Sequence, residues 1–299
     1  MLLVTCAACG GGSSSSGSVG AGGDRKAGAQ GLQHREIDVN GVGRRYRLFV
    51  PPTVDGKKAA PLTLVLHGAG NDVESTAKTT QFERIASSED FIVAYPEGLN
   101  RYWNGGFCCG SASADGVDDV AFLAAVIAEV KAGYAVDAAR ISMVGVSNGG
   151  IMAYRFGCER AELVTAIVSV AGAMRLEQCR PARPVSLLEI HGTADRSVPF
   201  NGGAVQPRSA LAKEPVPSTT AVVEHWAAAN GCPSTPETRN DGPVVATTWN
   251  NCRASTTVQL LAIGGAGHTW FAPGLGPANG AIDATTVITA FLGRLQPAR

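Results

Sequence analysis

Ile141-Ser-Met-Val-Gly-Val-Ser-Asn-Gly-Gly150 is the most informative stretch of the chain. Its first half has the length of a buried strand, and a helical pattern from Gly150 to Phe156 follows. Between them lies the Gly-x-Ser-x-Gly string of residues 145–149. A sharp turn from strand to helix strains the backbone of its serine and leaves room only for glycine on either side. The string alone is weak in a chain with 37 glycines, but its context predicts a nucleophile at Ser147.

The segments on both sides of this turn alternate between strand and helix patterns. A hairpin is expected at 35–50, because Asn40-Gly41 supplies the positive φ angles of a tight turn. Apolar runs predict buried strands at 62–66, 91–95, 141–146, 166–170 and 185–190, with two more near 244–249 and 258–263. Helical patterns lie at 118–131, 218–229 and 282–295. This order predicts a three-layer α/β domain with a mainly parallel sheet.

The first 31 residues differ in composition from the rest. From residue 10 to residue 23, twelve of fourteen positions are Gly or Ser. Such a segment cannot bury enough apolar surface to offset the entropy of ordering it. We therefore predict a leader and tether over residues 1–31 and one catalytic domain over residues 32–299.

A serine hydroxyl needs a base within hydrogen-bonding reach and a carboxylate that orients the base. In α/β-hydrolases these partners follow in the order Ser, acid, His. Asp195 comes just after the strand at 185–190, and His268 comes after the strand at 258–263. Both lie in loops after strands, where this architecture places its site. We predict that Ser147, Asp195 and His268 form a catalytic triad on an α/β-hydrolase fold without a large cap domain.

The other histidines and three acids have different expected roles. His34 precedes the first strand and His225 lies within a helix, so both are expected at the surface or in packing. His67 and His191 each end a strand directly before a glycine. A hydrogen bond that shapes the loop is the expected role of both, with a catalytic base as the alternative. Three acids precede the serine, against the usual order, and are expected to cap the following helix: Asp115, Asp118 and Asp119.

Acyl transfer also needs donors for a developing oxyanion. The backbone N–H of Asn148, directly after the nucleophile, is one expected donor. The second comes from a loop after an early strand, and His67-Gly-Ala-Gly70 fits this place, so we predict the N–H of Ala69. A simple glycine turn is the alternative. Trp103 and Trp270 flank these loops and are predicted to line a substrate cleft, unless they only cover the edge of the core.

Charge and hydropathy exclude several classes of partner. Lys plus Arg total 25, as do Asp plus Glu, so the formal net charge is zero. No run of basic residues provides the positive surface that nucleic acids or anionic membranes attract, so no nucleic-acid partner is predicted. The chain contains no stretch of about 18 apolar residues, so no transmembrane helix is predicted. No metal and no other cofactor is predicted.

Eight cysteines fall into three groups. Two precede the tether, Cys108 and Cys109 are adjacent, and four are widely spaced. No pair recurs at zinc-ligand spacing, which disfavours a metal site. Bridges Cys158–Cys179 and Cys232–Cys252 would each close a loop of about twenty residues and stabilise the fold by about 3 kcal/mol. They would persist only in an oxidising compartment. Buried free thiols are the alternative.

The segment Met1-Leu-Leu-Val-Thr-Cys-Ala-Ala-Cys9 resembles the end of a secretory signal, without the basic region that begins such signals. We expect the natural signal to begin upstream of Met1. Ala-Ala-Cys9 before a Gly/Ser tether also resembles a bacterial lipoprotein cleavage box. Cys9 is the expected lipidated residue, and Cys6 is the competing one. The hypothesis is a secreted, periplasmic or cell-envelope protein with a lipid anchor.

Seven strings span roughly residues 35–295: Leu66-His-Gly-Ala-Gly-Asn71, Tyr95-Pro-Glu-Gly98, Trp103-Asn-Gly-Gly-Phe-Cys-Cys-Gly110, Val117-Asp-Asp-Val-Ala-Phe-Leu123, Gly145-Val-Ser-Asn-Gly-Gly150, His191-Gly-Thr-Ala-Asp195 and Gly267-His-Thr-Trp270. Together they resemble the esterases related to polyhydroxybutyrate depolymerase, whose core is shared with feruloyl and acetylxylan esterases of carbohydrate esterase family one. The resemblance implies Ser147 as nucleophile, Asp195 as acid and His268 as base, and secretion with disulfides. It also implies that Cys108-Cys109 is a structural pair near the cleft, with a vicinal disulfide as one form.

Two positions depart from the pattern of this family. Ala69 stands where many relatives carry Cys, which retains the backbone donor but alters a neighbouring bridge. Phe271 follows Trp270 where relatives often have Pro-Gly, which predicts a different cleft rim. No appended binding module follows the last helix, which favours a soluble ester over a crystalline polymer.

The leading hypothesis is an exported, monomeric serine esterase. Its expected partner is a small or oligomeric carboxylic ester, either a polyhydroxybutyrate-type oligomer or a feruloyl or acetyl ester. The alternatives are a catalytically silent carbohydrate- or polymer-binding lipoprotein, and a peptidase or thioesterase of the same superfamily. Acyl and alcohol specificity stay open.

Overall fold

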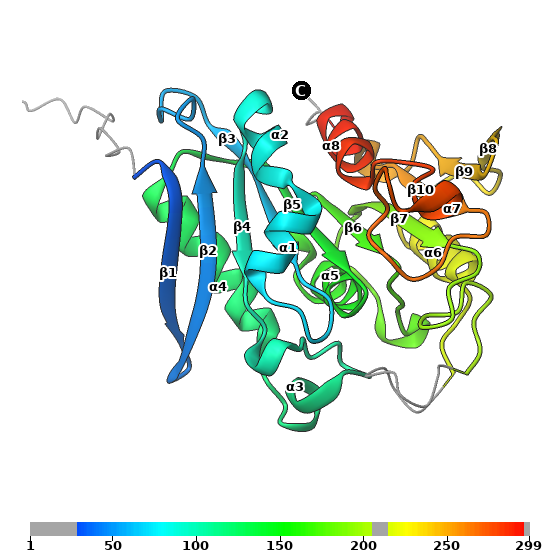
Figure 1. Cartoon of the computed structure of the whole chain (residues 1–299), viewed down its shortest axis with the longest axis horizontal. Helices are drawn as coiled ribbons and strands as arrows, with labels where there is room; N and C mark the ends of the chain where they lie inside the picture. The colour runs from blue at the N-terminus through cyan, green and yellow to red at the C-terminus, as the bar shows by residue number, and fades with distance from the viewer. Residues whose placement is uncertain (1–28, 205–214, 296–299) are drawn as a thin grey trace, which may run out of the picture.

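The computed structural model describes residues 29–204 and 215–295. One ten-stranded sheet runs through this part of the chain, in the order β1-β2-β4-β3-β5-β6-β7-β10-β9-β8 (Figure 1). The strands are β1 (Gly31–Val39), β2 (Val42–Val50), β3 (Ala60–Leu66), β4 (Ile92–Pro96), β5 (Val136–Val146), β6 (Ala166–Val170), β7 (Ser186–Gly192), β8 (Glu237–Asp241), β9 (Val244–Trp249) and β10 (Val258–Ile263). The six central strands, from β4 to β10 in the spatial order, are parallel, and antiparallel strands flank them on both sides. The predicted mainly parallel sheet is confirmed.

Helices cover both faces of this sheet. They are α1 (Val73–Thr80), α2 (Phe82–Glu89), α3 (Gly110–Ala114), α4 (Asp119–Gly133), α5 (Asn148–Glu159), α6 (Thr219–Ala229), α7 (Gly276–Asn279) and α8 (Ala284–Arg294). One core cluster joins Leu62 and Leu64 of β3 to α4, α5 and α6. A second joins Val65 of the same strand to α1, α2 and α8 on the other face. Successive strand side chains point to opposite faces, so one apolar strand serves both clusters and three layers result.

The hairpin at the start of the sheet forms as predicted. Asn40 and Gly41 have φ angles of 55° and 81°, and they join β1 to β2 in register. β1 begins at Gly31, the last residue of the predicted tether. The Gly/Ser segment before it, with Cys6 and Cys9, lies outside the described residues.

Two of the three acids expected to cap a helix do something else. Asp118 caps α4 as predicted, because its side chain accepts a hydrogen bond from the N–H of Ala121. Asp119 is fully buried, and its two oxygens accept from Arg44 and from the N–H of Asn104, both at 2.7 Å. Asp115 lies at the end of α3 instead. The prediction was therefore wrong for Asp115 and for Asp119, which joins β2 to the loop after β4.

Three disulfides cross-link the described residues. Cys158–Cys179 and Cys232–Cys252 are bonded as predicted, which makes the free-thiol alternative wrong for these four residues. Cys108 and Cys109 are bonded to each other. Disulfides persist in oxidising compartments, so the three bridges fit a protein outside the cytosol.

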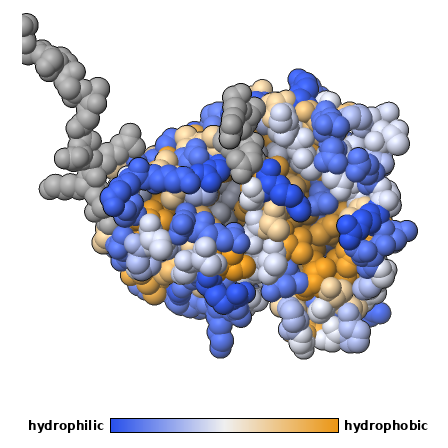
Figure 2. Space-filling model, turned by 90° about the horizontal axis from the view of Figure 1, so that it is seen from above, coloured by the Kyte–Doolittle hydropathy of each residue, from blue (hydrophilic) through white to orange (hydrophobic). Residues whose placement is uncertain are grey.

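The surface is mostly hydrophilic when seen from above (Figure 2). Hydrophobic residues gather in one area of this view, on the side where Figure 1 places α8 and β8 to β10. The exposed large hydrophobic side chains are Leu32, Val42, Val245 and Leu275. In the described ranges, no helix has both the length and the apolar composition needed to cross a bilayer.

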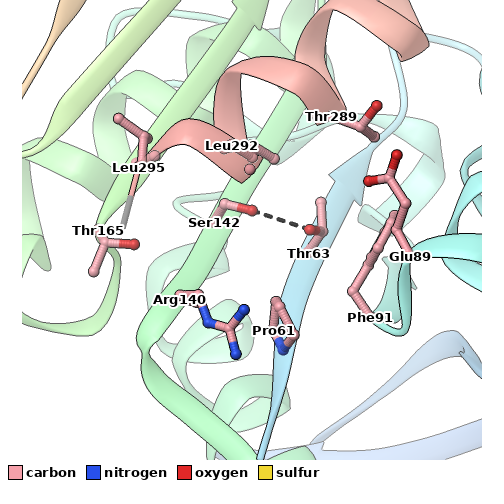
Figure 3. A pocket seen from close by; sticks show the side chains of 12 residues that line it. Pro61, Thr63, Glu89, Phe91, Arg140, Ser142, Thr165, Thr289, Leu292 and Leu295 are labelled. Carbon is pink, nitrogen blue, oxygen red and sulfur yellow. Dashed lines mark hydrogen bonds between the residues drawn. The ribbon is translucent and has the colours of Figure 1, made fainter. Parts of the chain in front are cut away.

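A small cavity lies among the amino-terminal halves of the parallel strands (Figure 3). Thr63 of β3 and Ser142 of β5 are neighbours on one wall of it, and their hydroxyl oxygens are 3.0 Å apart. Both residues precede the carboxyl ends of their strands by several positions. Since α/β sheets bind ligands at the carboxyl ends of their strands, the site is expected at the opposite end.

Candidate active site

The predicted nucleophile lies on a strained turn between β5 and α5. Ser147 has φ 56° and ψ −120°, a conformation that residues other than glycine rarely adopt. A Cβ on Gly145 would lie 2.1 Å from the carbonyl oxygen of Gly149, and one on Gly149 would lie 2.5 Å from the carbonyl oxygen of Leu66. The prediction that only glycine fits on either side is confirmed. The turn presents the Ser147 side chain at the carboxyl end of the sheet.

The other two predicted triad residues meet Ser147 there. His268 Nε2 lies 2.9 Å from Ser147 Oγ, and His268 Nδ1 lies 2.7 Å from Asp195 Oδ2. Asp195 follows β7 and His268 follows β10, strands that are paired in parallel, so their loops lie side by side. The carboxylate is fully buried, whereas a quarter of the imidazole is exposed. The His268 imidazole thus links the Ser147 hydroxyl to the buried Asp195 carboxylate and remains partly exposed.

Backbone and side-chain donors hold the Asp195 carboxylate in place. Its Oδ1 accepts from the N–H groups of Ser197 and Val198, at 2.8 and 2.9 Å. Burial would raise the pKa of this carboxyl, but hydrogen bonds from His191 and His268 outweigh burial and hold the pKa well below its usual range. Asp195 is therefore an anion throughout the neutral range and can orient His268.

The two predicted oxyanion donors flank Ser147. Asn148 is the first residue of α5, where a backbone N–H has no partner within the helix. Ala69 lies in the loop after β3, which packs against the nucleophile: a Cβ on Gly68 would lie 3.6 Å from Ser147 Cβ. The neighbouring N–H groups of Gly70 and Asn71 bond to the carbonyls of Arg101 and Gly68. The loop is thus held in shape beside the Ser147 hydroxyl.

Trp103 does not line the cleft, which corrects the prediction. The whole residue is buried, and its indole Nε1 donates to the carbonyl of His67 at 3.0 Å. The Asn148 side chain bonds both the N–H and the C=O of Trp103, at 2.8 and 2.9 Å. Trp103 therefore joins the loop after β3 to the start of α5. Trp103 can be buried because its backbone N–H, its backbone C=O and its indole N–H all form hydrogen bonds within the protein.

Trp270 does line a cavity beside the nucleophile. The cavity has a volume of about 320 Å³. Its walls come from the loop after β3, from α1 and from the loop that carries His268. The lining includes Ala69, Ser147, His268 and Trp270, with four hydroxyl residues of α1: Ser75, Thr76, Thr79 and Thr80. Phe271, which was expected to change the cleft rim, is buried in the core instead. The cavity therefore combines one aromatic wall with a hydroxyl-rich wall.

The remaining histidines follow their expected roles in part. The exposed His34 and half-buried His225 lie away from the triad, and His225 Nε2 bonds the carbonyl of Cys179. His67 shapes its loop, because its Nε2 accepts from the N–H of Gly98 at 2.9 Å. Burial lowers the pKa of His67 to about 4.

His191 also bonds within its loop, through the carbonyl of Val198, but it has a further contact that we did not predict. Its Nδ1 lies 2.8 Å from Oε1 of Glu189, and both side chains are fully buried. The signal was available: Glu189 is the one charged residue in the otherwise apolar run 185–190. A charged residue inside a buried strand requires a partner.

The vicinal cysteine pair packs close to this set of loops. Cys108 and Cys109 form a small buried cluster with Ile151 of α5 and Val198 of the Asp195 loop. None of these cluster residues is among those that line the cavity beside Ser147. The cluster connects the first turns of α5 to the loop that holds the acid.

The chain was compared with known families and structures. Residues 44–226 match the family model described as Esterase PHB depolymerase. Over 236 residues the chain is 31% identical to feruloyl esterase B of Piromyces equi, a match that covers 75% of this chain and 42% of that protein. It is 24% identical to the bifunctional acetylxylan esterase/xylanase XynS20E of Neocallimastix patriciarum, with 77% and 31% covered. The matched region thus spans less than half the length of both relatives.

Among solved structures, the acetyl xylan esterase from Aspergillus awamori superposes with a TM-score of 0.58 at 14% identity. The superposition covers 79% of this chain and 94% of that one. At such low identity the likeness shows the fold, and it confirms the predicted α/β-hydrolase architecture. Because the family model spans more than half of the chain, the chain belongs to the Esterase PHB depolymerase family, an esterase family, as its motifs predicted.

Proposed function

We propose that this protein hydrolyses carboxylic esters through a Ser-His-Asp acyl-enzyme mechanism. One observation carries the proposal: Ser147 Oγ, His268 and Asp195 form a continuous hydrogen-bonded line on a strained turn beside a cavity. Such a line gives a serine hydroxyl the base that it needs and gives the base its orientation. The family match supports the same chemistry.

In the first half of the reaction, Ser147 Oγ attacks the ester carbonyl carbon while His268 Nε2 takes the hydroxyl proton. The carbonyl oxygen becomes an oxyanion, which the N–H groups of Asn148 and Ala69 stabilise. The C–O bond to the alcohol then breaks, and His268 returns its proton to the leaving alcohol. Asp195 stabilises the imidazolium between these two steps.

In the second half, water attacks the acyl-enzyme, with His268 as general base. The bond to Ser147 Oγ breaks, the serine recovers its proton, and the carboxylic acid leaves. No group other than water and the ester is consumed. The chain's own residues thus account for each proton in both halves.

The proposed substrates are acetyl or feruloyl esters of carbohydrates and short 3-hydroxybutyrate oligomers. The hydroxyl-rich wall formed by α1 suits a polar part of such a substrate, and Trp270 offers an apolar surface on the other side. The names of the two relatives, a feruloyl esterase and an acetylxylan esterase, support the same classes.

Ser147→Ala tests the reaction. With p-nitrophenyl acetate or butyrate, the variant should lose at least about a thousandfold in kcat while its circular dichroism spectrum is unchanged. A fluorophosphonate probe should label the native protein and not the variant. Equal turnover by the two proteins would remove Ser147 from the mechanism, and an inert, unlabelled native protein would favour a binding protein. Methyl ferulate, acetylated xylan and 3-hydroxybutyrate oligomers, compared by kcat/KM, identify the substrate class.

We also propose that the protein is exported, as a monomer, with a lipid on Cys9. The disulfides and the Ala-Ala-Cys9 string before the Gly/Ser segment support export. Mass spectrometry of the native amino terminus should find a lipid-modified cysteine. An unmodified Met1 would contradict the anchor.

A further inference from the structure

A line of polar groups continues from Asp195 into the core. Asp195 Oδ2 accepts from His268, and His191 Nε2 lies 3.4 Å from the same oxygen on the other side. His191 Nδ1 lies 2.8 Å from Glu189 Oε1, and the Tyr154 hydroxyl donates to Glu189 Oε2 at 2.9 Å. The side chains of Glu189 and His191 are both at most 1% exposed. The proposed triad is thus the outer part of a longer chain of contacts.

The partners of His191 specify its charge. Nε2 lies 2.9 Å from the carbonyl oxygen of Val198, which can only accept, so Nε2 carries a proton. Nδ1 faces the Glu189 carboxylate; when Glu189 is ionised this group only accepts, so Nδ1 then carries a proton as well. An imidazole with protons on both nitrogens is a cation. His191 is therefore a positive charge between two carboxylates.

Within residues 29–204 and 215–295, Glu189 and Asp195 are the charged groups that contact His191. Strand β7 contributes Glu189, the following loop contributes Asp195, and helix α6 contributes the Thr219 hydroxyl, 3.3 Å from Nδ1. The ring of Phe200 covers another side, at 5.8 Å between centroids. Two carboxylates therefore set the charge of this ring.

The direction of the pKa shifts agrees with this geometry. Burial would lower the pKa of His191, but the hydrogen bonds to Asp195 and Glu189 outweigh burial and raise the pKa to about 9. Burial raises the pKa of Glu189, and the hydrogen bond from His191 opposes that rise. Burial, together with the negative charge of Glu189, keeps the pKa of Tyr154 well above its usual value, so the phenol stays a donor.

We propose that His191 and Glu189 are positioning residues that act through Asp195: a buried His191 cation, balanced by Glu189, holds the Asp195 carboxylate ionised and aimed at His268. This inference rests on the proposed ester hydrolysis. It extends the site from three residues to five and assigns a purpose to two charges that the core would otherwise not contain. Neither residue touches the substrate.

The cation also sets the basicity of His268. The Asp195 carboxylate attracts positive charge on the neighbouring His268 ring. The positive charge of His191, on the far side of the same carboxylate oxygen, partly cancels this attraction. Without His191, the attraction of Asp195 for a positive charge on His268 would be uncompensated.

The pH profile of kcat/KM tests this arrangement, with His191→Gln, Glu189→Gln and the control His225→Gln. His191→Gln removes the cation, so the acid-side midpoint of the profile should rise by about one pH unit. Glu189→Gln removes only the balancing negative charge and keeps an amide oxygen that can accept from Nδ1, so its midpoint should shift less. kcat should fall roughly tenfold as Asp195 loses a fixed partner. His225 is a histidine on α6 without a carboxylate partner, and His225→Gln should match the native profile. A fall in kcat without a shift of the midpoint in His191→Gln would overturn the proposal.

A second measurement needs only the native protein and covers the case in which a variant does not fold. Nitrogen-15 NMR of the histidine rings should show His191 with protons on both nitrogens up to about pH 8, and His67 with one. A neutral His191 at pH 7 would contradict the proposal, whatever the kinetics.

The two proposals can fail separately. If Ser147→Ala retains full activity, ester hydrolysis through this triad is wrong, but the NMR result still decides the charge of His191. If Ser147→Ala is inactive while His191→Gln and Glu189→Gln keep the native midpoint, only the positioning role is wrong.

Discussion

His67 and His191 occupy equivalent places in the chain and carry different charges. His67 directly follows β3 and His191 is the last residue but one of β7; each directly precedes a glycine, and each is fully buried. His67 accepts a hydrogen bond from the N–H of Gly98 at Nε2, while Nδ1 faces the carbonyl of Gly68, so the ring carries one proton and is neutral. His191 meets acceptors at both nitrogens and is a cation. Burial alone therefore does not decide the charge of a histidine.

The difference follows from the carboxylates around each ring. Burial lowers the pKa of His67 to about 4, and no carboxylate bonds to it among the described residues. Glu189 and Asp195 flank His191 and raise its pKa to about 9 against the same effect of burial. The neutral ring shapes the loop that carries Ala69, and the charged ring supports Asp195. One residue type thus serves both halves of the site in two protonation states.

The largest expected effect is a difference in unfolding free energy between variants of the two histidines. His191→Leu leaves Glu189 and Asp195 without their shared cation, and breaking a buried charge pair in this way costs about 3–5 kcal/mol. His67→Leu leaves one buried N–H without an acceptor, which costs about 1–3 kcal/mol. Urea denaturation at pH 7 with the disulfides intact should therefore rank His191→Leu as clearly less stable than His67→Leu.

The two substitutions remove side chains of the same size and add the same apolar group, so each serves as the control for the other. Equal losses of unfolding free energy would mean that a positive charge on His191 does not stabilise the fold through Glu189 and Asp195. The same result would remove the main contrast between the two loops.

The second expected effect is that the two histidines contribute to the unfolding free energy in different pH ranges. The folded pKa of His67 is about 4 and the unfolded value about 6.5, so below pH 6.5 the unfolded chain binds a proton that the folded chain does not. Stability from His67 therefore falls as pH decreases from 6.5 to about 4. The folded pKa of His191 is about 9, so its contribution is complete below pH 6.5 and is lost as pH rises through 9. Over each of these pH ranges the free energy of unfolding should change by about 3 kcal/mol at most.

Unfolding free energies from urea titrations between pH 4.5 and 9.5 check both slopes. His67→Gln should remove the acid slope and keep the alkaline one, and His191→Gln should do the reverse. The low pKa of Asp195 places its own contribution below this pH range. A native protein whose stability is flat from pH 6.5 to 9.5 would contradict the assignment for His191.

Most of the fold and the triad could be predicted from sequence, because the signals are local. The strands β6, β9 and β10 have the predicted bounds, since each is a short apolar or β-branched run between turns. α1 was missed. Its sequence, VESTAKTT, has little apolar periodicity, and the helix depends on the capping box of Asp72 with Ser75 and on packing against the sheet.

The charge network could not be predicted, because it depends on contacts between distant segments. Glu189 and His191 are two residues apart on one strand and so share a face, but their pairing with Tyr154 of α5 exists only in the fold. The same holds for Asp119, which bonds Arg44 of β2, and for Trp103, whose burial follows from its contacts with His67 and Asn148. Sequence identifies reactive side chains by type and order, and the fold decides which polar groups support them.

The smallest expected effect concerns the tryptophan on the His67 side. Trp103→Phe keeps an aromatic ring 4.9 Å from the His67 ring but removes the indole N–H that bonds the His67 carbonyl. The lost hydrogen bond should cost about 1–2 kcal/mol of stability. Because that carbonyl lies two residues before Ala69, the loop loses part of its support and kcat for an ester should fall about tenfold, with KM nearly unchanged.

Trp226→Phe is the matched control on the His191 side. Trp226 is equally buried, and its Nε1 donates to the carbonyl of Val185 at 2.7 Å. The same N–H is lost there, with a similar stability cost, but the carbonyl lies at the start of β7, far from the oxyanion loop. kcat of Trp226→Phe should stay within about twofold of the native value. If both variants lost kcat equally, the effect would come from reduced stability, and Trp103 would have no specific part in holding the Ala69 donor.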